Sequence, residues 1–87
     1  MHIAIGQTVI TPGAIAILAV TDVLNALARH AAGDWGDVCG EDRLANDEAL
    51  RTGARLLSAY RDCEGVKFWI ITEADRSVTT ILLPEEY

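Results

Sequence analysis

Three side chains that could bind a metal ion lie close together in the first half of the chain. His30, Asp34 and Asp37 offer an imidazole and two carboxylates, which are ligands that suit several divalent ions. They would come from the end of a predicted helix and the loop after it, with no second histidine nearby. A surface histidine that interacts with the C-terminal end of its helix explains His30 more simply. We therefore predict no metal site.

A second group with possible acid–base chemistry is formed by Glu73, Asp75 and Arg76. Paired carboxylates act as acid and base when one of them is desolvated and its pKa rises. These residues occupy a predicted hairpin turn, where exposure leaves little desolvation. Asp75 is more simply explained as a turn former, and Arg76 as its ion-pair or cross-strand partner.

The possible nucleophiles have no histidine near them in sequence. They are Cys39, Cys63, Ser58 and Ser77. The two histidines lie at the amino end and in the first third of the chain, far from most of these residues in sequence. Whether the fold brings one of them close to a nucleophile is left open by the sequence. There is no glycine-rich phosphate loop, and the two cysteines are predicted to be free thiols. The sequence thus favours a protein that is not an enzyme and carries no cofactor.

Charge is concentrated in residues 34–48, where six acidic residues face only Arg43, giving a net charge of −5 out of −6 for the chain. So acidic a chain is unsuited to binding nucleic acid directly and better suited to basic protein surfaces. Two interpretations stand: a solvated helix face, or a strip that mimics phosphates and occupies the nucleic-acid groove of a partner. Trp35, between two Gly-Asp pairs, is either an exposed anchor for that partner or a plug at the core edge.

The first half of the chain predicts one strand and two or three helices. Thr11 is suited to cap a helix that starts at Pro12, Thr21-Asp22 offers a second cap, and Gly33 and Gly53 are suited to end helices. The predicted elements are a strand over Ile3–Ile10 and helices over Gly13–Val20, Val23–Ala31 and Glu41–Thr52.

The last third predicts three antiparallel strands joined by tight turns, over Arg55–Arg61, Val66–Thr72 and Ser77–Leu83. The middle strand is apolar on both faces. Either helices cover one face while long side chains such as Arg55 and Arg61 shield the other, or the second face binds a partner or a second copy. The whole chain, residues 1–87, is predicted to be one α+β domain: a three-stranded antiparallel meander with helices on one face, joined at an edge by the first strand.

Residues 3–21 carry no charge and superficially resemble a membrane span. Gln7, Thr8, Thr11 and Pro12 interrupt the stretch, so it predicts a strand, a turn and a buried helix. The chain also begins without the basic residues of a secretory signal. We expect a cytoplasmic protein with no membrane contact.

Several segments together resemble a family of small proteins carried by plasmids, phages and integrated elements of proteobacteria. They are Gly33–Val38, Glu41-Asp42, Asn46-Asp47, Ala49-Leu50, Leu57–Arg61, Trp69–Ser77 and Leu82–Tyr87. The resemblance covers nearly the whole chain and supplies no catalytic residues.

The resemblance implies an accessory protein of a mobile element. We expect a non-enzymatic, anti-CRISPR-like inhibitor that binds a bacterial defence effector, either a protein or a ribonucleoprotein complex. The alternative is a homodimeric accessory or regulatory protein of a plasmid or phage with no defence role. The predicted contact residues are Asp34, Trp35, Asp37, Glu41, Asp42, Asp47, Glu73, Asp75 and Arg76.

Overall fold

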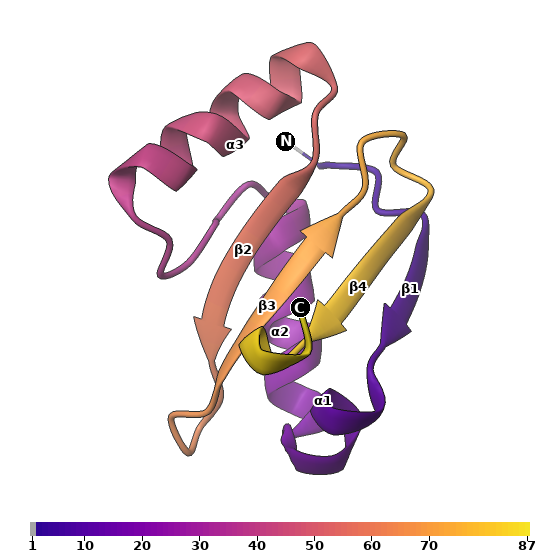
Figure 1. The fold of residues 1–87 in the computed structure, drawn as a ribbon, viewed down its shortest axis with the longest axis vertical. Helices are drawn as coiled ribbons and strands as arrows, with labels where there is room; N and C mark the ends of the chain where they lie inside the picture. The colour runs from indigo at the N-terminus through magenta and orange to yellow at the C-terminus, as the bar shows by residue number, and fades with distance from the viewer. Residues whose placement is uncertain (1) are drawn as a thin grey trace.

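The computed structural model describes residues 2–87 as an α+β domain with one sheet (Figure 1). Its elements in chain order are β1 (Gln7–Ile10), α1 (Pro12–Ile17), α2 (Val20–Ala31), α3 (Gly40–Thr52), β2 (Leu56–Arg61), β3 (Lys67–Thr72), β4 (Val78–Leu82) and the short 3₁₀ helix η1 (Pro84–Glu86). The predicted fold class is confirmed at this level.

The sheet has four strands in the order β1-β4-β3-β2. Strands β2, β3 and β4 form the predicted antiparallel meander, with Trp69 of β3 lying between Ala59 and Leu82. β1 joins the sheet at an edge, as predicted, but it pairs with β4 in parallel, so the sheet is mixed and not purely antiparallel. β1 also starts later than predicted, because Ile3 bonds to Ala31 O and Gly6 turns the chain with a φ of +61°.

The helix boundaries show where local signals decided the structure. Thr11 caps α1 by accepting a hydrogen bond from the Ala14 amide (3.3 Å), as predicted. α1 ends at Ile17, earlier than predicted, and α2 begins at Val20 after Ala19 rather than after Thr21-Asp22. The Asp22 carboxylate instead accepts a bond from the Cys63 amide, in the turn between β2 and β3 (2.8 Å).

The two groups of helices cover different parts of the sheet. α1 and α2 pack on one face, where Ala14, Val23 and Ala26 meet Phe68 and Ile70. α3 lies beside the edge strand β2, not on that face (Figure 1). A second, smaller cluster holds it there and consists of Ile3, Trp35, Ala49 and Leu56, with Val38 and Leu50 at its margin.

The other face of the sheet is covered in part by the end of the chain. The Tyr87 ring meets the edge of the Trp69 ring at 5.6 Å, and the Arg55 guanidinium lies over Tyr87 at 5.5 Å and donates to its hydroxyl. Ile71 and Leu82 on this face are buried. Arg55 therefore acts as the shield that the sequence predicted, although it does so through Tyr87.

Candidate protein-binding groove

A groove of about 380 Å³ lies between the start of α3 and the uncovered part of the sheet. Its floor is apolar and is formed mainly by Leu57, Ala59 and Trp69. Its other lining residues are Asp37, Val38, Cys39, Asp42, Arg61, Lys67 and Pro84. We call this surface the α3–sheet groove. An apolar floor with charged groups at its rim is an arrangement that can hold a side chain of a protein partner.

Two sets of hydrogen bonds cover the outer edge of β2 and hold α3 beside it, and the groove lies between them and the sheet. The Asn46 side chain of α3 acts as a strand partner, donating to Leu57 O (2.7 Å) and accepting from Leu57 N (3.0 Å). The loop before α3 pairs with Ala59, whose amide bonds to Trp35 O and whose carbonyl accepts from Asp37 N. Both contacts fix the start of α3 beside the sheet, and both occupy edge groups that would otherwise be open to a partner strand.

This close approach requires glycine at position 36. Gly36 has a φ of +71°, and a Cβ atom there would lie 2.1 Å from the Ala59 carbonyl oxygen. An L-residue would be strained at that φ and would also collide with the backbone of β2. The Gly-Asp-Trp-Gly-Asp segment is therefore first of all a device that joins a loop to a strand.

Charges of opposite sign occupy different sides of the groove. Asp37 and Asp42 lie on the α3 side, while Arg61 and Lys67 are register neighbours at the end of β2 and β3. An ion pair joins the two sides loosely, because Arg61 Nε and Asp37 Oδ2 are 3.9 Å apart and both side chains are more than half exposed. So exposed a pair adds little stability and leaves both groups available to a partner.

Trp35 does not form the exposed anchor that one interpretation of the sequence required. Its side chain is 2% exposed, and its indole N–H donates to the Asp47 carboxylate (3.1 Å). Asp34, next to it, is engaged by Arg29 (2.7 Å), and this hydrogen bond lowers the pKa of the Asp34 carboxyl. These three predicted contact residues hold the loop in place, with the Asp34 carboxylate also accepting from the Gly36 amide.

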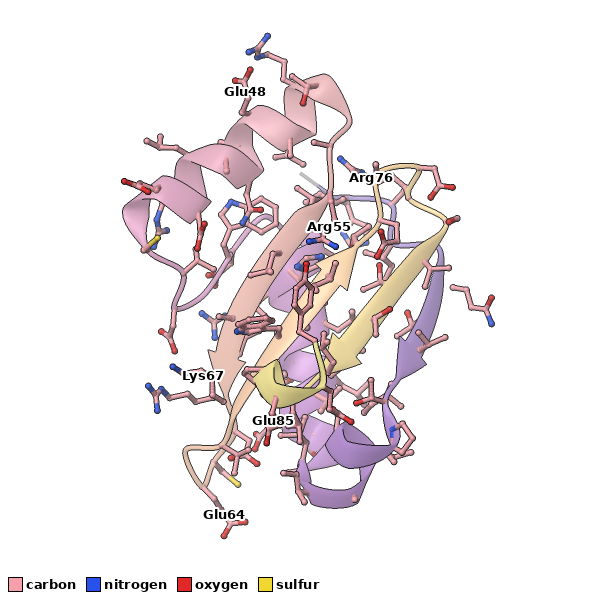
Figure 2. The ribbon with its side chains drawn as sticks, in the orientation of Figure 1. Glu48, Arg55, Glu64, Lys67, Arg76 and Glu85 are labelled. Atoms are coloured by element: carbon pink, nitrogen blue, oxygen red, sulfur yellow. The ribbon has the colours of Figure 1, made fainter. Side chains whose placement is uncertain are left out.

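The Glu73–Arg76 turn is likewise built into the fold. Asp75 accepts bonds from the side chain and the backbone of Ser77, which lower its pKa. Arg76 donates to Ala49 O and Ala54 O, and so closes the C-terminal end of α3. Arg76 and Lys67 lie toward opposite ends of the molecule in Figure 2. The structure thus separates this turn from the groove, while Asp37, Asp42 and the exposed Glu41 stay together at the start of α3.

His30 is a core residue, and its prediction as a surface histidine was wrong. Its Nδ1 lies 2.5 Å from Ser58 Oγ and its Nε2 lies 2.8 Å from Thr72 Oγ1, with no exposed surface. Thr72 in turn contacts Thr79, which donates to Ile5 O (2.6 Å). Because Thr79 uses its proton on Ile5, Thr72 donates to Thr79 and accepts from His30, so the ring carries its proton on Nε2.

Burial, together with a smaller effect of the nearby positive charge of Arg76, lowers the pKa of His30 to about 4. The network keeps the neutral ring satisfied at both nitrogens. The network is hard to predict from the sequence, because its members are far apart in the chain. A polar residue on the inner face of each of the three meander strands was the signal available: Ser58, Thr72 and Thr79.

The structure does bring a serine and a histidine together, which sequence spacing alone could not decide. Ser58 and His30 are both fully buried, so no substrate can reach them in this conformation.

Cys39 and Cys63 are free and exposed. Across residues 2–87 no three His, Cys, Asp or Glu side chains are grouped so that they could hold a metal ion. Within the same residues, no helix has the length and apolar character needed to cross a membrane.

Comparison with protein-family models, curated proteins and solved structures finds no match to the chain.

Proposed function

We propose that the protein is a non-enzymatic binding module that inhibits a bacterial defence complex by docking on one of its proteins through the α3–sheet groove. The observation that carries the binding role is the groove itself, with an apolar floor, carboxylates on its α3 side and basic side chains on its sheet side. The defence target follows from the resemblance to proteins of mobile elements.

The groove selects the chemistry of its partner. An apolar side chain fits against Leu57 and Trp69, whereas a lysine or arginine beside it meets Asp37 and Asp42. A basic groove that normally holds nucleic acid presents such side chains, so the acidic α3 side of the rim would take the place of phosphates. Because the rim groups are exposed, the attraction is screened by salt, and association slows as ionic strength rises.

The test expresses the protein in a CRISPR-bearing proteobacterium and measures how efficiently a targeted phage forms plaques. We expect plaque formation to be restored, and tagged protein to capture a subunit of the defence complex at low salt and to lose it at moderate salt. A double variant, Asp37→Asn with Asp42→Asn, should abolish both effects.

A matched control removes the same two charges elsewhere, by Glu64→Gln with Glu85→Gln. Both residues are exposed, and neither lines the groove (Figure 2). Equal loss of inhibition in both double variants would show that total charge matters and not the groove. Full inhibition by the Asp37/Asp42 variant would contradict the proposed contact surface.

The second candidate function is a homodimeric accessory or regulatory protein of a mobile element. An uncovered apolar surface far from the groove favours it. Phage plating separates the two functions, because a protein with no defence role leaves plaque formation unchanged.

A further inference from the structure

The surface at the junction of α1 and α2 is apolar and uncovered. Ile15 of α1 is 63% exposed, and Val20 and Leu24 of α2 are 69% and 60% exposed. With Ile10, Leu18 and Val23 they line a hollow of about 210 Å³. Large side chains left in contact with water at this density mark an interaction surface. We call Ile15, Val20 and Leu24 the apolar patch.

The open edge of the sheet adjoins this patch. β1 is an edge strand, and its last residue, Ile10, forms a wall of the hollow. Gln7 N donates to Ser77 O, just before β4, and Thr11 N donates to Ile81 O of β4. The alternation of a parallel ladder therefore directs the N–H and C=O of Thr8 away from the sheet. A free edge of this kind pairs readily with another strand.

The distribution of charge around the apolar patch favours a second copy of the chain over a charged partner. No charged side chain occurs in residues 2–21, and the first one along the chain, Asp22, is already engaged by the Cys63 amide. The acidic helix α3 lies beside β2, at the opposite edge of the sheet from β1. The patch residues therefore carry no charge of their own, and the Glu86 carboxylate at the start of α1 is already bonded to Thr11 and Gly13 N. A second copy can approach the patch without bringing the acidic helices together.

We propose that the apolar patch and the β1 edge bind a second copy of this chain. Around a twofold axis the two β1 strands run antiparallel. The outward N–H and C=O of Thr8 in each copy then hydrogen-bond to the C=O and N–H of Thr8 in the other copy, so one surface binds its own copy. Each patch lies at the Ile10 end of its own β1, so antiparallel pairing places it beside the Gln7 end of the other copy's β1. A stable interface takes about 800 Å² from each partner, roughly a sixth of the 4927 Å² surface of this chain. This proposal does not depend on the α3–sheet groove.

The experiment measures molar mass by sedimentation and by light scattering over a wide range of protein concentration. We expect the mass to rise from 9.4 kDa to twice that value as concentration increases. Leu24→Glu should hold the protein at the monomer mass throughout the range. Its control is Leu44→Glu, which changes an equally exposed helical leucine (70%) on α3 and should dimerise like the unmodified chain.

A second variant, Thr8→Pro, removes the outward N–H and leaves the bonds to β4 in place, because proline is tolerated where the amide of an edge strand faces solvent. It should weaken dimerisation at least tenfold. Circular dichroism and thermal unfolding establish that each variant is folded. A monomer at every concentration overturns the proposal, as does equal weakening by Leu24→Glu and Leu44→Glu. A monomer that binds neutral lipid vesicles through Leu24 would assign the patch to a membrane surface, and so would also overturn it.

Discussion

Mild acid should destabilise this protein through one buried side chain, His30. The ordinary pKa of histidine, 6.5, applies to the unfolded chain, and burial lowers it to about 4 in the folded protein. The unfolded state therefore binds the proton more tightly, so the stabilisation is complete above pH 6.5 and is lost as pH falls toward 4. From these two values the free energy of unfolding should fall by about 2 kcal/mol between pH 7 and pH 5, and by about 3 kcal/mol at pH 4.

The window between pH 7 and pH 5 isolates this effect. The carboxyls with shifted pKa values, Asp34, Asp75 and Glu86, are all shifted downward, so they titrate at lower pH. Urea unfolding at a series of pH values gives the free energy directly. His30→Gln keeps a donor and an acceptor but does not titrate, so its free energy should be flat over this window, at a lower absolute value. His2→Gln, which changes the exposed second histidine, should keep the full slope.

NMR adds an independent check, because ring nitrogen shifts report both the charge and the tautomer of His30. We expect a neutral ring protonated on Nε2 at pH 5. A charged ring at that pH, or a pH slope that survives in His30→Gln, would refute the argument that burial and the hydroxyl network hold the ring neutral.

Two further predictions concern how α3 is held against the sheet. Gly36→Ala should destabilise the fold by about 3 kcal/mol, since it combines a strained φ with a clash against Ala59 O. Gly40→Ala, whose Cβ meets nothing within 4 Å, should change stability by less than about 1 kcal/mol in urea unfolding. Asn46→Asp preserves shape but faces Leu57 O with a second acceptor, so it should cost about 1–3 kcal/mol at pH 7. A neutral result in thermal unfolding would show that water replaces this bond.

The sequence predicts what depends on local pattern. The meander strands follow from the alternation of apolar residues, and α3 and its end at Gly53 follow from helical spacing and from a glycine that adopts a φ of +82°. The parallel pairing of β1 could not be predicted, because it joins Gln7 to Val78 across the length of the chain. The same limit applies to His30 and to Asn46. Each is a polar residue on a helix, and only the partners that folding brings to it show that it is buried.

The candidate site was predicted in part, and the reason is the same. Charge density drew attention to residues 34–48, but it cannot separate acids that hold the loop from acids whose carboxylates have no partner among the described residues. Asp34 and Asp47 satisfy donors of Arg29 and Trp35, whereas Asp42 lines the groove. The apolar face that carries Trp69 was considered as a partner surface, but strand pattern alone does not reveal that a helix begins beside Leu57 and Trp69 and makes a groove there.

The two edges of the sheet are treated differently, and this asymmetry connects the two proposed surfaces. At β2 the fold supplies a side chain and a loop to occupy the edge, and in doing so it creates the groove beside α3. At β1 the Thr8 backbone points outward next to uncovered apolar side chains. An open edge promotes uncontrolled association unless something covers it. In the proposed symmetric dimer, β1 of the second copy covers this edge. The groove of each copy then faces outward at the opposite edge of the sheet, where a partner can reach it.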